Sequence, residues 1–329
     1  MRRRCAWAPR FGIVVCALLV AVPTATAQKS RRAIPAVGRW LVPRTPDGRP
    51  DLQGIWSNMT ATPLQRPRDF GDKSHFTRAE AVEYARTWLE RLVQEEDEED
   101  RTGADLNEIY LDDRAVVPDL RTSLIVDPPT GRLPPLLRAA EERLDARPHA
   151  KYDDPEARPL GERCILGVDG GSALAAPIVP NLFSGNFYQI VQTPAHVMIF
   201  TEQIHDTRIV RIGGAHLPAT LQRWLGDSIG RWEGDTLVVD TTNIHTNAVF
   251  RGATARLHVV ERFSRTGPAT VTYRATVDDP ETWAVPWTLE FPFVATEQRL
   301  FEYACHEGNY ALEGVLRGAR ADEKAGRKR

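Results

Sequence analysis

The segment 226–243 places the strongest constraint on how this chain can fold. Its sequence, GDSIGRWEGDTLVVDTTN, contains a tryptophan-bearing strand, a Glu-Gly-Asp turn and a strand rich in β-branched residues. Two β-type runs separated by a short glycine turn are typical of a β-hairpin. The sequence therefore predicts a hairpin that turns at Glu233-Gly234-Asp235, within a larger antiparallel β structure.

The period of two recurs along most of the chain after residue 186. Successive segments alternate apolar and polar side chains and are joined by short turns: 187–192, 197–202, 207–212, 229–232, 236–242, 256–264, 270–277, 287–293 and 300–305. Sequential strands favour an antiparallel meander, and closure into a barrel removes its exposed edges. The predicted fold is mainly β with an N-terminal helical segment and a closed barrel. A β-sandwich is the alternative.

The N-terminus has the pattern of an export signal. Residues 1–27 combine a basic start, an apolar run and the small residues Ala25-Thr26-Ala27. Cleavage before Gln28 removes four arginines and no acid, which leaves 38 basic and 44 acidic side chains. This acidic balance is unfavourable for nucleic acids and for anionic membrane surfaces. We expect a secreted or periplasmic protein that binds no nucleic acid and has no stable membrane insertion after cleavage.

Composition divides the rest of the chain. The predicted parts are an extended Pro- and Arg-rich segment at 28–75, a helical and loop region at 76–185, the barrel at 186–318 and a disordered charged tail at 319–329. Helical spacing of apolar residues places helices at 76–92 and 136–147, and a short closing helix at 311–317. A Thr-x-x-Glu capping box, Thr77 to Glu80, marks the start of the first helix.

Two cysteines remain after signal removal, Cys164 and Cys305. In an oxidising compartment, two distant cysteines commonly form a disulfide. The sequence therefore predicts a bridge with Cα atoms within about 7 Å of each other. A zinc site is not expected, because the chain has no C-x-x-C motif and too few thiol ligands. No metal and no cofactor are predicted.

Four motifs carry a resemblance to known proteins. They are TPDGRPDLQGIW at 45–56, SLIVDPP at 123–129, the hairpin at 226–243 and YACHEGNY at 303–310. Together they resemble a large family of secreted proteins in soil bacteria, notably acidobacteria, and the match covers nearly all of the mature chain. This family is uncharacterised, so the resemblance implies no activity and no catalytic residues. The hairpin also resembles calycin-type barrels, which implies a fold that holds small ligands.

Gly-Asp-Ser-Ile-Gly at 226–230 matches the G-x-S-x-G motif of serine hydrolases. A serine elbow needs a strand, a sharp turn and then a helix. Here Ser228 lies at the start of a hairpin strand, so a structural serine is favoured over a nucleophile. The glycine-rich stretch 167–175 lacks the Walker lysine and the G-x-G-x-x-G spacing, and is predicted to be a loop.

Two histidine-centred turns carry the groups best suited to acid–base chemistry. One is His205-Asp206, between two predicted strands, and the other is His306-Glu307, after the last predicted strand. Histidine titrates near neutral pH, and a carboxylate can orient it. We predict these four residues as the catalytic groups if the protein is an enzyme, at one end of the barrel. The alternative is that they are hydrogen-bonded turn residues.

A second group of residues is predicted to bind a ligand in the barrel or at its mouth. These residues are Arg208, Trp232, Glu261, Glu302 and Tyr310. Side chains alternate along the strand 256–264, and each of its two faces carries an ionisable residue. Whichever face points into the barrel, an ionisable side chain is therefore buried there. A lone buried charge is very costly. An internal Glu–Arg salt bridge and a ligand-binding group are the two interpretations.

Three functions remain open from the sequence. The favoured one is a secreted β-barrel that binds a small, partly apolar molecule. The second is a cofactor-free hydrolase, lyase or isomerase that uses histidine and carboxylate groups. The third is a structural or envelope protein that uses its Pro-rich arm. The predicted partner is a small-molecule ligand or substrate, and the sequence does not determine the oligomeric state.

Overall fold

The structure is a computed structural model, and it describes residues 40–87, 114–145, 152–167, 176–180, 186–248 and 250–327. The chain divides into two units, Met1–Arg39 and Trp40–Arg329. The predicted export signal and most of the glycine-rich stretch 167–175 lie outside the described residues.

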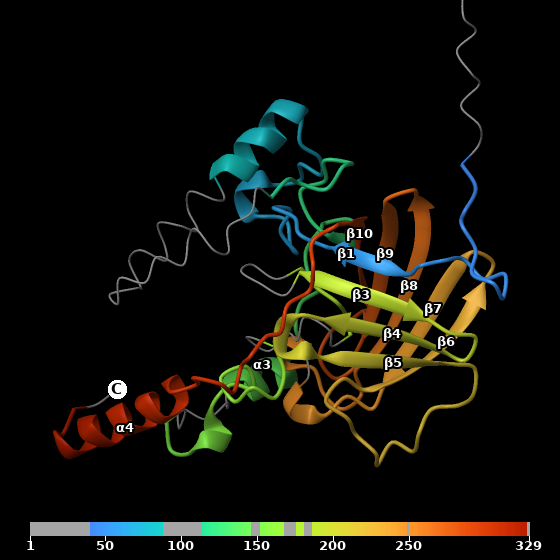
Figure 1. Cartoon of the computed structure of the whole chain (residues 1–329). Coiled ribbons are helices and arrows are strands. Elements are labelled where there is room, and N and C mark those ends of the chain that lie inside the picture. Colours follow the sequence, from blue (N-terminus) through green and yellow to red (C-terminus); the bar gives the residue numbers. More distant parts are fainter. Residues whose placement is uncertain are drawn as a thin grey trace, which may run out of the picture. The chain divides into compact units, whose positions relative to one another are not determined.

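Strands β1 and β3–β10 close into a barrel (Figure 1). In sheet order they are β1 (Gly54–Ser57), β3 (Phe187–Gln192), β4 (His196–Thr201), β5 (Thr207–Ile212), β6 (Asp227–Glu233), β7 (Thr236–Thr242), β8 (His258–Gly267), β9 (Thr270–Asp278) and β10 (Trp287–Ala295). β1 pairs with both β3 and β10, which closes the ring. The mainly β, mostly antiparallel barrel is confirmed, and the β-sandwich alternative is wrong.

The predicted hairpin is formed by β6 and β7. Asp227 pairs with Thr242 at the open end, and Glu233 pairs with Thr236 beside the turn. Ser228 shares a hydrogen bond of 2.8 Å with the hydroxyl of Thr241 on the facing strand. Ser228 therefore lies within a strand and begins no helix, which removes the geometry that a serine elbow needs.

The strand predicted at 300–305 is wrong. These residues have no strand pairing, and the side chain of Phe301 is 70% exposed. The last part of β10 pairs instead with β1, from the N-terminal half of the chain. Trp56 in β1 pairs with Ala295 on one side and with Tyr188 on the other. A second short strand, β2 (Ile125–Asp127), pairs with the first part of β10.

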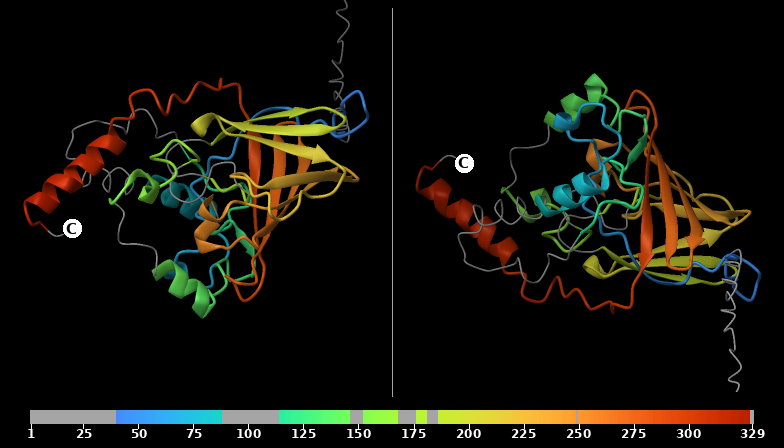
Figure 2. Two further views of the ribbon diagram at one scale, coloured as in Figure 1. Left: turned by 90° about the horizontal axis from the view of Figure 1, so that it is seen from below. Right: turned by 90° about the horizontal axis from the view of Figure 1, so that it is seen from above.

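The helices lie outside the ring of strands (Figure 2). The first predicted helix is described over 78–87, and the backbone N–H of Thr77 donates to the Glu80 carboxylate at 2.8 Å, as its capping box requires. α3 (Arg138–Asp145) matches the second predicted helix. α4 (Ala311–Lys324) extends the predicted closing helix into residues expected to be disordered. Within the described residues, no helix is long and apolar enough to cross a membrane.

Aromatic side chains fill the barrel interior. The largest fully buried rings are Trp56, Tyr188, Phe263, Tyr273, Trp287, Phe291 and Phe293. Ring centroids lie 5.0 Å apart for Tyr273 and Phe291, and 5.2 Å apart for Tyr188 and Phe293. Burying a side chain of this size stabilises the fold by about 1.5–3 kcal/mol. The middle of the barrel is thus packed core.

Loops gather at one end of the barrel, where β4 ends and β5 begins (Figure 2). Residues 152–167 and the segment that follows β10 reach this end in both views. We call this end the mouth.

Candidate functional site

An ion pair is buried inside the barrel. Arg208 of β5 and Glu261 of β8 are 2% and 0% exposed, and their charged groups meet through two contacts of 2.9 Å. Alternation along β8 turns Glu261 inward, between the buried Val259 and Phe263. The internal Glu–Arg salt bridge, one of the two interpretations of this strand, is therefore present. A ligand-binding role for the two residues stays a prediction.

Two tyrosines extend this polar group. The Tyr273 hydroxyl donates to Glu261 at 2.8 Å and accepts from the backbone N–H of Ile178 at 2.8 Å. Burial raises the pKa of Tyr273, and the charge of Glu261 raises it further. Burial also raises the pKa of Tyr188, whose hydroxyl accepts from the Asn58 amide at 3.4 Å. Both phenols are therefore protonated at neutral pH and serve as hydrogen-bonding groups.

Several buried polar atoms have no hydrogen-bond partner among the described residues. They include Asn58 Oδ1, both carboxamide atoms of Gln203, and Arg208 Nε. Asn58 is 1% exposed and Gln203 is 0% exposed. Leaving a buried polar group unpaired costs about 1–3 kcal/mol. Native proteins keep such groups where water or a ligand completes the bonding.

These carboxamides lie at the mouth. Asn58 directly follows β1, and its backbone N–H bonds to the carbonyl of Asn186, just before β3. Gln203 comes two residues after Thr201, the last residue of β4, which pairs with Tyr188. We name six buried residues the mouth cluster: Asn58 and Gln203 at this end, and Tyr188, Arg208, Glu261 and Tyr273 on the strands that lead inward from it.

A strained turn holds Gln203 in place. Ile204 and His205 adopt left-handed backbone conformations, with φ of 56° and 45°. Such a conformation costs about 1–3 kcal/mol for a residue other than glycine, and it is commonest at functional sites. The turn leaves Gln203 buried and His205 exposed. The backbone is thus strained next to a buried side chain that has no hydrogen-bond partner in the described residues.

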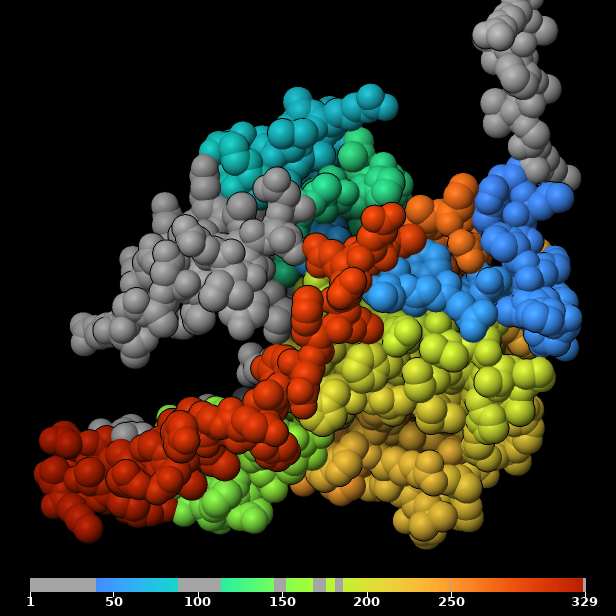
Figure 3. All heavy atoms as spheres, viewed as in Figure 1, coloured from blue at the N-terminus to red at the C-terminus, as the bar shows by residue number. Residues whose placement is uncertain are grey.

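The segment 297–310, which we name the strap, runs along this turn. The ring nitrogen Nδ1 of His205 lies 3.4 Å from the carbonyl oxygen of Tyr303. The backbone N–H of Phe301 donates to the Glu202 carboxylate at 2.6 Å. Figure 3 shows the strap in orange to red, lying on the surface beside the yellow-green strands.

A disulfide ties the strap to an earlier loop. Cys164 and Cys305 are bonded, with Cα atoms 5.7 Å apart, so the predicted bridge is confirmed. The side-chain amide of Asn309 donates to the carbonyl of Glu162 at 2.8 Å, next to the bridge. The two connections hold the strap beside the loop 159–167.

Most of the remaining predicted site residues lie on the strap or close to it, but Trp232 lies in β6 beside the hairpin turn, away from the mouth. His306, Glu307, Glu302 and Tyr310 are exposed, Asp206 is half-buried, and Trp232 packs partly buried against the core. The ring of His205 thus lies beside Tyr303 of the strap, and the expected meeting of His205 and His306 stays a prediction. The catalytic and binding roles of these residues stay predictions.

A chain of ionisable groups on the outer wall of the barrel was not predicted from the sequence. Asp227 of β6 is 2% exposed and accepts from Arg211 Nη2 at 2.9 Å through each carboxylate oxygen. It also accepts from the backbone N–H of Leu217 at 2.9 Å and contacts His216 Nδ1 at 3.0 Å. The other ring nitrogen of His216 lies 3.0 Å from Asp240, which also contacts His258 at 2.9 Å.

This chain anchors a crossover. β5 and β6 pair in parallel, so the connection 213–226 must return along the barrel before β6 begins. Burial acts to raise the pKa of Asp227, but the bonds from Leu217 and His216 and the charge of Arg211 hold it below its ordinary value. The ionised carboxylate therefore pins the connection to the wall. Only the outward positions of Asp227 and Asp240 in the hairpin hint at this from sequence.

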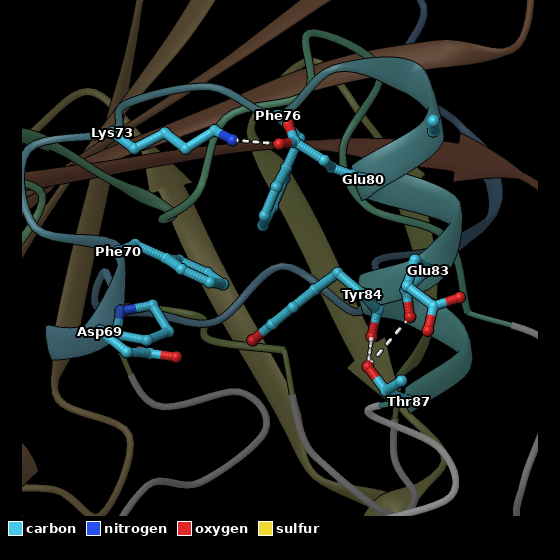
Figure 4. A pocket seen from close by; sticks show the side chains of 10 residues that line it. Asp69, Phe70, Lys73, Phe76, Glu80, Glu83, Tyr84 and Thr87 are labelled. Atoms are coloured by element: carbon cyan, nitrogen blue, oxygen red, sulfur yellow. Dashed lines mark hydrogen bonds and ion pairs between the residues drawn. The ribbon is translucent and has the colours of Figure 1, made fainter.

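A pocket of about 560 Å³ lies beside the helix at 78–87 (Figure 4). The rings of Phe70, Phe76 and Tyr84 pack together along it, with centroids 5.1–5.5 Å apart. At its edge Lys73 pairs with Glu80. Pockets of this size hold small molecules. Its lining includes none of the unpartnered buried side-chain atoms found in the described residues, so nothing in it requires a ligand.

Comparison with known proteins assigns no identity, because no family model, curated protein or solved structure matches the chain. In the part of the chain that the structure describes, no group of three or more His, Cys, Asp or Glu residues is placed to hold a metal ion. The mouth cluster is therefore the strongest candidate site, on the grounds of burial and unmet hydrogen bonding.

Proposed function

We propose that this protein binds a small, partly apolar molecule at the mouth cluster of its barrel. The observation that carries the proposal is Gln203, which is fully buried with neither carboxamide atom bonded within the described structure. The left-handed turn at Ile204 and His205 adds strain beside it. A site that costs stability while empty is expected where ligand binding is the selected property.

The surroundings fit a partly apolar ligand. Tyr188 packs against Phe293, and Tyr273 packs against Phe291, so aromatic surface borders the polar groups. Small-molecule sites combine such apolar walls with a few placed hydrogen-bonding groups. The disulfide supports a location outside the reducing cytoplasm. Binding is favoured over acid–base catalysis because His205 and His306 are exposed, whereas Glu261 is held by Arg208.

Two matched Gln→Leu substitutions test the proposal. Gln203→Leu should raise the free energy of unfolding of the ligand-free protein by about 1–3 kcal/mol, because it removes an unpaired buried amide. Gln192→Leu should lower it by about 1–3 kcal/mol, because the Gln192 side chain bonds to Leu52 and Pro50. Both values come from urea denaturation followed by tryptophan fluorescence.

Binding provides the second measurement. Calorimetric titration of both variants with small amides and alcohols should show that Gln203→Leu loses the binding that the wild type and Gln192→Leu retain. If Gln203→Leu destabilises the protein as Gln192→Leu does, Gln203 has a structural partner and the proposal fails. It also fails if Gln203→Leu leaves the affinities unchanged.

A further inference from the structure

We infer that the mouth cluster selects an electrically neutral molecule that both donates and accepts hydrogen bonds, such as a carboxamide, over organic anions and cations. The inference rests on the proposed function and specifies the ligand class. It follows from the charges of the cluster and from its unmet hydrogen bonds.

The charges of the mouth cluster cancel. Arg208 and Glu261 face each other through two contacts of 2.9 Å, so their charges neutralise each other, although Arg208 Nε has no hydrogen-bond partner in the described residues. The other members carry neutral amides or phenols, since burial keeps Tyr188 and Tyr273 protonated. A ligand ion would lose its hydration without gaining a net counter-charge from this neutral pair, and that exchange is unfavourable. To gain a counter-charge, it would have to break the existing pair, which is strongly destabilising.

The buried atoms without a hydrogen-bond partner include both donors and acceptors. Asn58 Oδ1 and Gln203 Oε1 are acceptors that need a donor, whereas Gln203 Nε2 and Arg208 Nε are donors that need an acceptor. A carboxamide presents an oxygen and an NH₂ group and can meet both needs. A carboxylate only accepts, so it would leave the two oxygens unpaired. An ammonium group only donates, so it would leave the two nitrogens unpaired.

Discrimination of this kind is steep. A site that hydrogen-bonds a polar group rejects an analogue that lacks it, because its own buried groups are then left unpaired. Aromatic rings packed against Tyr188 and Tyr273 give the cluster apolar surroundings. We expect a neutral amide to bind at least about 10-fold more tightly than a charged molecule of the same shape.

Two matched sets of probes test the inference on the full chain. The small set is acetamide, acetate and ethylammonium, and the larger set is benzamide, benzoate and benzylammonium. Calorimetric titration at pH 7 and fixed ionic strength should give an amide dissociation constant at least about 10-fold below those of its charged counterparts. Gln203→Leu should remove this preference, and Gln192→Leu should keep it.

The outcomes separate the two proposals. If benzoate or benzylammonium binds as tightly as benzamide, and Gln203→Leu abolishes that binding, the ligand class is wrong while the binding function stands. If no probe in either set gives saturable binding, or if amide binding persists unchanged in Gln203→Leu, the mouth cluster is not a ligand site. In that case both proposals fall.

Discussion

Replacing Asp227 with asparagine should detach the connection 213–226 from the outer wall of the barrel. The carboxylate is 2% exposed and accepts from Arg211, from His216 and from the backbone N–H of Leu217. Asparagine has nearly the same shape but keeps only one acceptor oxygen. Its NH₂ group would face at least one of the donors that now point at the carboxylate.

The size of the effect follows from these bonds. A hydrogen bond to a charged group contributes about 1.5–3 kcal/mol, and removing one partner of a buried ion pair costs about 3–5 kcal/mol. Arg211 is 36% exposed, so solvent screens its share of the interaction. We therefore expect Asp227→Asn to lower the free energy of unfolding by about 3 kcal/mol at neutral pH. Urea denaturation followed by tryptophan fluorescence measures this difference.

The effect should depend on pH with a definite sign. The pKa of folded Asp227 lies below the ordinary value of 3.8. The ionised carboxylate therefore stabilises the fold fully above about pH 4, and this contribution is lost as the pH falls through the folded pKa. The wild type and Asp227→Asn should differ most near neutral pH, and the difference should shrink at pH 3. Hydrogen exchange should show faster opening of residues 213–226 in the variant.

Glu233→Gln is the matched control on the same hairpin. Glu233 also pairs with two arginines, Arg231 and Arg262, but its side chain is 40% exposed. Exposed pairs contribute little, so the control should shift the urea midpoint only slightly. If Asp227→Asn shifts the midpoint no further than this control, or equally at pH 3 and pH 7, the carboxylate does not anchor the crossover.

Three further predictions concern other parts of the chain. Reducing the bridge between Cys164 and Cys305, which lie 141 residues apart, should lower the thermal midpoint of unfolding. In the chain-entropy model the closed loop contributes about 5 kcal/mol. An unchanged midpoint, with both thiols shown to be free by titration, would contradict this. Gly226→Ala should destabilise the protein more than Gly48→Ala. Both positions have positive φ, but a Cβ at Gly226 would lie 2.8 Å from neighbouring atoms, whereas Gly48 has open space. Equal midpoints of unfolding for the two variants would refute the reasoning. The exported protein should begin at or near Gln28, and N-terminal sequencing that finds an intact signal in the membrane fraction would overturn the export prediction.

Much of the barrel could be predicted because its strands alternate between a buried and an exposed face. Strands β3–β10 all show this alternation in the sequence, and the position of the hairpin turn can also be predicted. Alternation does not show which edges pair, however. The Leu300–Cys305 stretch alternates yet stays outside the sheet, whereas β1, of four residues, gives too short a pattern to detect. The closing strand was therefore assigned to the wrong end of the chain.

The site was predicted only in part, for a related reason. An ionisable residue of strand 256–264 could be placed inside the barrel, because alternation puts one on each face and a buried charge demands a partner. Gln203 and Asn58 gave no such signal, because neutral amides are common in turns. Their burial depends on the left-handed turn at Ile204 and on pairing between distant strands. Such tertiary effects leave no periodicity in the sequence.

β5 links the mouth cluster to the crossover, and this link yields a last prediction. Arg208 and Arg211 are an odd number of residues apart, so they project from opposite faces of the strand. Arg208 pairs inward with Glu261, and Arg211 pairs outward with Asp227. β5 is therefore held on both faces, and losing the outer pair should loosen the inner one. Asp227→Asn should weaken benzamide binding less than about 10-fold, since the polar groups remain but are less firmly positioned. Calorimetric titration of this variant beside Gln203→Leu measures the effect. An affinity equal to that of the wild type would show that the two faces of β5 act independently.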